Sequence, residues 1–270
     1  MTTSPTRSQQ YRALGLSTFS FTLCFAVWTI FSIIGIRIAE DLALSDTQLG
    51  LLMATPILTG SISRLFLGIW TDRYGGRWVF GILMITTALC VYLLTFATTY
   101  PMLLVGALGV GLAGGSFIVG VAYTAAWFEP GRQGTALGIF GAGNVGSAVT
   151  NFGAPFLLVA FGWEQTALIY ATVLAVMGVV FLLVAREDPM AQERGGEKAK
   201  SFMEQMEPLK ELRVWRFALY YFFVFGAFVA LALWLPHYLI GVYGLDIRTA
   251  GMIAALYTIP ASLFRILGGW

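Results

Sequence analysis

Long apolar stretches separated by short polar connections divide the chain into regular units. A helix that crosses a bilayer needs about 20 predominantly apolar residues, and eight stretches meet this condition. They cover residues 14–38, 48–70, 78–98, 101–127, 134–161, 166–185, 215–243 and 249–270. The pattern therefore predicts an all-α membrane protein with eight spanning helices.

One connection, residues 186–214, is much longer than the others and rich in charge. Apolar residues recur at a helical spacing in its second half, at Phe202, Met206, Leu209 and Leu212. This spacing is typical of a helix that lies along a membrane surface. We expect a six-helix N-terminal half at 1–185, a central loop at 186–214 and the start of a second half at 215–270.

The distribution of charge predicts how the helices are oriented. Of the 16 Lys and Arg residues, 12 fall in alternate connections on the side of the N-terminus, and only Arg37 and Arg248 fall in the opposite connections. Because cytoplasmic loops are enriched in Lys and Arg, we expect a multi-pass protein of the cell (inner) membrane with its N-terminus in the cytoplasm.

Composition narrows the class of protein further. The mean hydropathy of +0.78 and the 11% of charged residues exclude an ordinary soluble domain. A net charge of +2 indicates no nucleic-acid partner. Cys24 and Cys90 both lie in apolar stretches, and their number and spacing suggest neither a disulfide framework nor a metal site. We expect no cofactor.

The second and eighth stretches are related by an internal repeat. Laying residues 44–68 over residues 245–269 pairs six identical residues, among them Arg64 with Arg265 and Gly68 with Gly269. Helix 8 then corresponds to helix 2, which implies two six-helix halves in parallel repeat. We expect four further helices after Trp270 and interpret the chain as a truncated form of a twelve-helix protein.

The repeated arginines are the strongest candidates for a functional site. Arg64 and Arg265 lie deep in apolar stretches, whereas all 14 Asp and Glu residues fall in loops or at helix ends. An unpaired guanidinium in hydrocarbon costs at least ~3 kcal/mol and marks a functional site by default. We predict that the pair binds a small anion in transit. The alternative is that each side chain extends to the membrane interface.

A glycine-rich basic sequence follows helix 2: Gly68-Ile-Trp-Thr-Asp72-Arg73-Tyr-Gly75-Gly76-Arg77. It resembles the loop signature of the major facilitator superfamily, with Gly76 in place of one basic residue. The resemblance implies a conformational role, in which the loop fastens one half of the protein against the other. The residues that carry it are Gly68, Asp72, Arg73, Gly75 and Arg77. The alternative is an ordinary basic loop.

The fifth stretch is dense in glycine and contains G-x-G-N-x-G at Gly141, Gly143, Asn144 and Gly146. This sequence resembles the nitrate signature of the nitrate/nitrite porter family. The resemblance implies that Gly141, Gly143 and Asn144 bind the substrate, with the Asn144 amide as a donor. The alternative is helix packing, since small residues let backbones approach. A dinucleotide-binding loop is excluded because it requires a preceding strand.

Two aromatic residues extend the resemblance to helices 4 and 7. Phe117 follows a run of small residues, and Tyr221 begins the sequence Y-x-x-x-F-G. The resemblance implies that they stack on and hydrogen-bond a flat oxyanion. Packing or interface anchoring is the alternative for both, because aromatic residues commonly serve these roles in membrane helices.

Taken together, the motifs imply a secondary transporter, and not an enzyme, that moves nitrate or nitrite by alternating access and is a monomer when complete. The spans contain no Asp or Glu, and His237 at the end of the seventh stretch is interpreted as an interface residue, so exchange of nitrate for nitrite is the simpler mechanism. Three alternatives stay open: proton-coupled nitrate symport, a carrier of another small anion, and an inactive truncated remnant.

Overall fold

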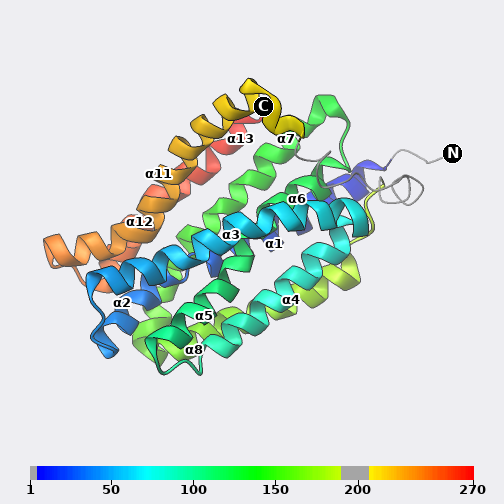
Figure 1. Cartoon of the computed structure of the whole chain (residues 1–270). Helices are drawn as coiled ribbons and strands as arrows, with labels where there is room; N and C mark the ends of the chain where they lie inside the picture. The colour runs from blue at the N-terminus through cyan, green and yellow to red at the C-terminus, as the bar shows by residue number, and fades with distance from the viewer. Residues whose placement is uncertain (1–4, 190–206) are drawn as a thin grey trace.

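The computed structural model describes residues 5–189 and 207–270, and these ranges form a bundle of helices without strands (Figure 1). Its first part contains α1 (Arg7–Trp28), α2 (Phe31–Asp41), α3 (Asp46–Tyr74), α4 (Gly76–Leu94), α5 (Tyr100–Gly111), η1 (Leu112–Gly115), α6 (Ser116–Ala125), α7 (Pro130–Gly141), η2 (Ala142–Val145) and α8 (Gly146–Val184). After the central connection come η3 (Glu207–Lys210), α11 (Leu212–Tyr243), α12 (Ile247–Leu263) and α13 (Arg265–Gly268).

Seven helical stretches within the described ranges are long and apolar enough to cross a membrane, and the longest, Pro130–Val184, has 55 residues. A straight helix of this length would measure about 80 Å, far more than the ~30 Å of a bilayer core. The backbone leaves the helical conformation at Gly162, where φ is 83°. The Tyr170 hydroxyl bonds Thr150 Oγ1 at 3.3 Å although 20 residues separate them. The stretch therefore folds back, and the eight predicted spans are confirmed.

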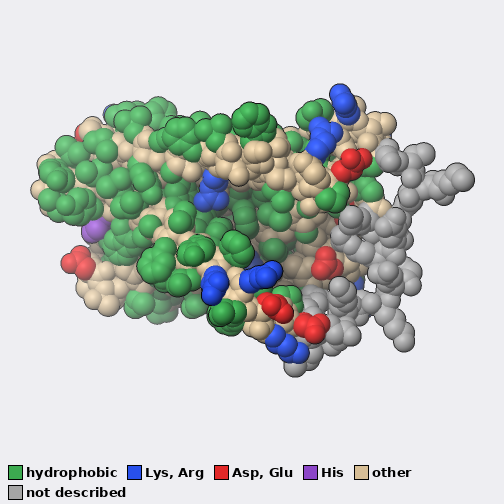
Figure 2. Space-filling model, turned by 90° about the horizontal axis from the view of Figure 1, so that it is seen from above, with side chains coloured by type: hydrophobic (Ala, Val, Ile, Leu, Met, Phe, Trp, Pro, Cys, Tyr) green, Lys and Arg blue, Asp and Glu red, His purple; other side chains and the backbone are tan. Residues whose placement is uncertain are grey.

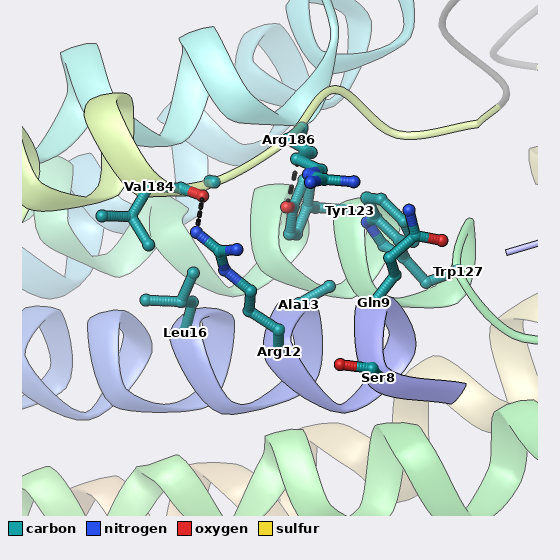
Figure 3. Close-up of a pocket in the computed structure, with 10 residues that line it drawn as sticks. Ser8, Gln9, Arg12, Ala13, Leu16, Tyr123, Trp127, Val184 and Arg186 are labelled. Carbon is teal, nitrogen blue, oxygen red and sulfur yellow. Dashed lines mark hydrogen bonds between the residues drawn. The ribbon is translucent and has the colours of Figure 1, made fainter. Parts of the chain in front are cut away.

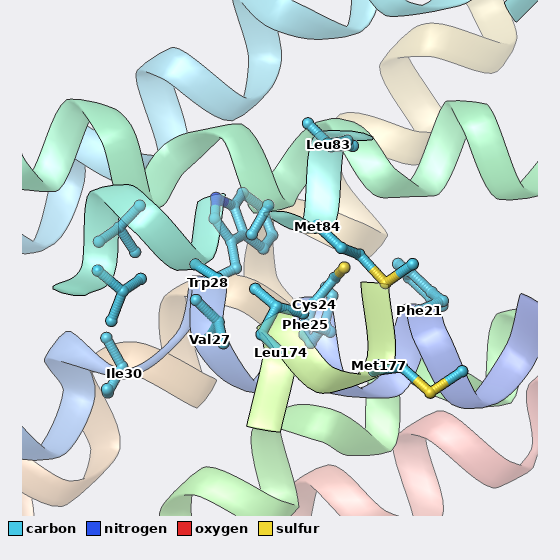
Figure 4. Packing of buried hydrophobic residues seen from close by; sticks show 14 of the residues in the cluster. Phe21, Cys24, Phe25, Val27, Trp28, Ile30, Leu83, Met84, Leu174 and Met177 are labelled. Atoms are coloured by element: carbon cyan, nitrogen blue, oxygen red, sulfur yellow. The ribbon is translucent and has the colours of Figure 1, made fainter. Parts of the chain in front are cut away.

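Buried apolar side chains of α1, α4 and α8 form the core of the bundle (Figure 4). Phe21, Trp28 and Met84 are each at most 2% exposed, and Leu174 is fully buried beside them. Large apolar side chains also cover the outside, as the space-filling view shows (Figure 2). Burial inside and apolar exposure outside together are what a lipid-embedded helical bundle requires. The chain is a multi-pass membrane protein.

Charged side chains gather toward one end of the molecule in Figure 2. We call it the basic end; it holds the start of α1, the α3–α4 turn, the α6–α7 turn and the residues after α8. The opposite end holds the turns after α2, at Gly162 and after α11. Phe202 and Met206 of the predicted surface helix lie outside the described residues, so that prediction stays open.

The internal repeat is visible at the start of the paired helices. Ser45 caps α3 by accepting a hydrogen bond from the Gln48 amide, and Asp246, its partner in the repeat, caps α12 in the same way. One difference appears further along: α3 runs without interruption through Arg64, whereas the second helix breaks at Phe264, and Arg265 begins α13. The break follows Pro260, whose ring and missing N–H weaken the helix around it.

Candidate functional site

Arg64 lies on α3 among aromatic side chains from three other helices. Its Nε donates a hydrogen bond to the Gly114 carbonyl at 3.0 Å. Its guanidinium carbon lies 5.6 Å from the ring centre of Trp28 and 5.8 Å from that of Phe117, within the range of cation–π attraction. The backbone bond and the rings hold the head group inside the bundle, so it does not extend to the basic end.

Arg265 approaches the same place from α13. Its guanidinium carbon lies 5.5 Å from the ring centre of Phe225 and 5.6 Å from that of Phe228, both on α11. The Phe225 ring is also 5.9 Å from the guanidinium carbon of Arg64. One buried ring therefore contacts both cations, and the structure brings the two predicted arginines together.

Tyr221 completes this cluster from the preceding turn of α11. Its ring stacks on Phe225, with 4.9 Å between centroids and an interplanar angle of 18°. The hydroxyl interacts electrostatically with both Arg64 and Arg265 and lies within hydrogen-bonding reach of Arg265. Tyr221 thus offers a polar group beside the two guanidiniums.

No carboxylate neutralises the pair within the part of the chain that the structure describes. The ion pairs found there join Arg37 to Glu40 and Asp41, and Arg77 to Glu187. A cavity of about 600 Å³ between α3 and α11 reaches Arg64 and Tyr221 and is otherwise lined largely by apolar and aromatic side chains. Two unpaired cations beside an apolar cavity form an environment that favours an anion.

The glycines of the fifth predicted stretch, which forms most of α7, η2 and the first part of α8, divide into two groups. Gly141 faces the arginine cluster, because a Cβ added there would lie 3.6 Å from Arg265 Cδ. Gly143 faces α1 instead, where a Cβ would lie 2.6 Å from the Phe21 ring and 3.1 Å from the Thr18 carbonyl. The structure therefore places Gly143 in close packing against α1, and the substrate contact expected of Gly143 stays a prediction.

Asn144 is fully buried in η2, and its amide nitrogen donates to the Gly141 carbonyl of its own turn at 2.8 Å. Its side-chain oxygen has no hydrogen-bond partner among the described residues. The Asn144 amide is buried as expected, but its nitrogen already donates to a backbone carbonyl of the same helical segment. One amide proton is left over for a ligand, so a donor role for Asn144 stays a prediction.

The loop motif makes a tight junction between α3 and α4. Gly75 has φ 82°, a conformation that favours glycine, and ends α3. Gly76, which replaces a basic residue of the family pattern, allows close approach: a Cβ there would lie 2.7 Å from Tyr123 Cβ. The Gly76 amide donates to Asp188 at 3.4 Å.

Arg77 extends the junction across the basic end. Its guanidinium donates to the Leu182 carbonyl near the end of α8 and lies 3.7 Å from Glu187 Oε1. The Arg73 guanidinium packs over the neighbouring Tyr74 ring at 5.3 Å. A Cβ added at Gly68 would lie 3.7 Å from Ile118 of α6, an ordinary contact distance. The motif thus joins α3 and α4 to α6 and to the end of α8, within the first part of the chain.

Four groups of the arginine cluster escaped sequence analysis: Trp28, the Gly114 carbonyl, Phe225 and Phe228. A signal for two of them was present, since Tyr221, Phe225 and Phe228 recur at i, i+4 and i+7 and so share one face of α11. Nothing in the sequence indicates that the Gly114 carbonyl contacts Arg64, or that Trp28 does so rather than another of the eight tryptophans.

Comparisons with known proteins extend over nearly the whole chain. Residues 16–270 match the Major Facilitator Superfamily. The chain is 44% identical over 276 residues to a probable nitrate/nitrite antiporter, NarK1, of Thermus thermophilus, covering 98% of this chain and 61% of the relative. It is 32% identical to a nitrite extrusion protein of Bacillus subtilis (strain 168), covering 97% of this chain and 65% of the relative. These matches confirm the resemblance stated from the motifs.

A solved structure has the same fold. It is a bacterial homologue of the human lysosomal transporter Spinster in an inward-facing, unoccupied conformation, with a TM-score of 0.74 and 18% identity. The match covers 94% of this chain and 60% of that chain. The chain thus spans less than two thirds of the length of each protein it resembles here.

Proposed function

We propose that this chain, which belongs to the major facilitator superfamily, forms the arginine-bearing part of a carrier that moves nitrate or nitrite across the cytoplasmic membrane. The observation that supports this most is the Phe225 ring in contact with both Arg64 and Arg265. The relatives named as nitrate and nitrite transporters favour the same class of substrate.

The chemistry of the cluster suits a planar oxyanion. A guanidinium presents a planar fork of donors that matches an oxyanion better than a compact ammonium does. The bond from Arg64 Nε to the Gly114 carbonyl uses one donor and leaves the terminal nitrogens for the anion. The Phe225 ring is buried and lies against both head groups, and apolar surroundings of this kind strengthen the attraction between the guanidiniums and an anion.

Alternating access would expose this cluster to each side in turn. We take residues 1–185 and 215–270 as belonging to different halves, with the basic end in the cytoplasm because of its excess of Lys and Arg. Two cations without an internal partner are unfavourable in an empty site, so a second anion should occupy the site for the return step. Exchange of nitrate for nitrite follows from this electrostatic constraint.

The test uses the complete protein that contains this chain, reconstituted in vesicles. Arg64→Lys and Arg265→Lys should each abolish nitrate uptake, because lysine keeps the charge but loses the planar fork. Arg37→Lys is the matched control, since Arg37 is exposed and paired with Glu40 at the opposite end. Near-normal uptake by either of the first two variants would remove the arginine pair from the site.

The mode of coupling needs a separate measurement. Vesicles loaded with nitrite should take up nitrate faster than empty vesicles, whatever the pH gradient. Uptake that depends on an imposed pH gradient and ignores internal nitrite would instead indicate proton symport.

A further inference from the structure

A second cluster of cations lies at the basic end, remote in sequence from Arg64 and Arg265. A cavity of about 100 Å³ opens between the first turns of α1, the end of α6 and the residues that follow α8 (Figure 3). Arg12, on α1, and Arg186, which follows α8, both border this cavity, and Trp127 forms part of its wall. A volume of this order holds about three water molecules, or a group the size of a phosphate.

The lining of this groove is positively charged. It includes two guanidiniums and no carboxylate. The two acids that follow Arg186 in the sequence lie outside this lining: Glu187 lies 3.7 Å from Arg77, and Asp188 accepts from the Gly76 amide. Both also interact electrostatically with Tyr123 of the groove wall. The groove therefore carries positive charge that its own lining does not balance.

One hydrogen-bond donor at the groove, the Trp127 indole N–H, has no acceptor among the described residues. The Trp127 side chain is buried, with the residue 5% exposed, and its Nε1 has no acceptor within residues 5–189 and 207–270. The Tyr123 hydroxyl lies near this nitrogen and donates to the Arg186 carbonyl at 3.0 Å, but its oxygen accepts no well-formed hydrogen bond from the Trp127 Nε1. A buried N–H without an acceptor is costly, so an acceptor supplied from outside would stabilise the groove.

Arg12 is already held in place for a ligand. One terminal nitrogen donates to the Val184 carbonyl at 3.0 Å, which carries the side chain across from α1 to the end of α8 (Figure 3). The remaining guanidinium donors are not used by any described residue. Arg186 makes no side-chain hydrogen bond in the same ranges. Within the described ranges, neither cation has an ion pair to break before it binds an anion.

We propose that this groove binds the phosphate of an anionic phospholipid in the leaflet at the basic end. Basic pockets between spanning helices on this side of a membrane suit anionic head groups. A path for the acyl chain is present, because Arg12, Gly15 and Phe19 share one exposed face of α1, and Phe19 is 57% exposed. Inorganic phosphate offers the same head-group chemistry without the chain, and the experiment separates the two.

The test is native mass spectrometry of the detergent-purified chain titrated with phosphatidylglycerol. The double variant Arg12→Gln/Arg186→Gln should lower the affinity for one bound lipid at least tenfold. The matched control is Arg213→Gln/Arg216→Gln, which removes the same charge from exposed positions at the start of α11 and should stay within twofold of the unchanged chain. Trp127→Phe keeps the ring but removes the N–H, and should lower affinity about threefold.

Two results would overturn the proposal. One is equal lipid binding by the Arg12/Arg186 variant and the control variant. The other is displacement of the lipid by millimolar inorganic phosphate, which would identify a site for the free ion. Because Arg12 also bonds the Val184 carbonyl, Arg186→Gln alone provides a variant that leaves this internal bond intact, and it should lower affinity at least threefold.

Discussion

Phe225 contacts both guanidiniums with its ring, and the Tyr221 ring stacks on it. An aromatic ring attracts a cation through its face without neutralising the charge. The ring therefore keeps both head groups in place while leaving their charge for a ligand. A carboxylate in the same position would hold the arginines more strongly but would compete with the anion.

Two neighbouring tyrosines, Tyr220 and Tyr221, should differ in their effect on nitrate binding. Tyr221→Phe keeps the stacked ring but removes the hydroxyl near Arg265, and should weaken nitrate binding by up to about tenfold, the equivalent of one hydrogen bond of ~1.4 kcal/mol. Tyr220→Phe is the control, because Tyr220 is 63% exposed. Calorimetric titration of the complete protein with nitrate measures both. Equal affinities would exclude the Tyr221 hydroxyl from the site.

A second prediction concerns Glu187 at the basic end. Burial raises the pKa of Glu187 above its ordinary value of 4.5, although Arg77 opposes this, and the charge of Asp188 raises it further. The folded state thus favours the protonated form, and this contribution to stability is lost as the pH rises through the raised pKa.

Glu187→Gln replaces the carboxyl with a group that does not titrate, so the loss of stability with rising pH disappears in this variant. Its thermal midpoint relative to the unchanged chain should therefore increase as the pH rises above 4.5, as thermal unfolding at a series of pH values would show. Glu129→Gln, at an exposed position of the same end, is the control. A difference for Glu187→Gln that does not change with pH would contradict the assignment.

At the scale of helices, α8 and α1 approach so closely that glycine is required. A Cβ at Gly146 would meet the Thr22 carbonyl and lie 2.7 Å from the Ala26 nitrogen, whereas a Cβ at Gly153 on the same helix would meet nothing within 4 Å. Gly146→Ala should lower the free energy of unfolding by about 1–3 kcal/mol. Gly153→Ala should be neutral or stabilising by up to ~1 kcal/mol.

Thermal unfolding in one detergent compares the two variants directly. Both make the same chemical change in the same helix, so differences in helix propensity cancel. A loss of stability in Gly153→Ala as large as that in Gly146→Ala would show that the packing argument is wrong.

Sequence reasoning located the spans well because hydropathy and length determine which segments can cross a bilayer. It also found the arginine pair, since a charge in an apolar stretch conflicts with its surroundings and so stands out. The internal breaks at η1 and η2 were not predicted. Their glycine-rich sequences are as apolar as the helices on either side, and only the crossing of neighbouring helices shows that the backbone tightens there.

The same limit explains the aromatic groups that were missed. Trp28, on α1, is distant in sequence from Arg64, and its indole faces that guanidinium only because α1 and α3 cross. The Trp28 Nε1 donates to the Pro56 carbonyl of α3 at 2.9 Å. Contacts that depend on helix crossing have no counterpart in local sequence periodicity.

At the scale of the whole molecule, Asn151 links the two parts of the chain. Its amide nitrogen donates to the Ala232 carbonyl of α11 at 3.1 Å, and its oxygen accepts from the Ser32 hydroxyl at 2.9 Å. Both side chains are fully buried. In the described ranges, this is the one side-chain hydrogen bond found between residues before the central connection and residues after it. A carrier that alternates between two states has to break such a link when the parts separate.

Asn151→Leu should therefore favour the state in which this contact is open. Loss of one buried hydrogen bond of about 1 kcal/mol changes the ratio of two states about fivefold. Thr150→Val is the matched control, because Thr150 donates to the Ala26 carbonyl within the first part. Spin labels at Glu40 and Tyr243, both exposed at the opposite end, would report longer distances for Asn151→Leu alone in the complete protein. Unchanged distances would mean that α8 and α11 do not separate at this contact.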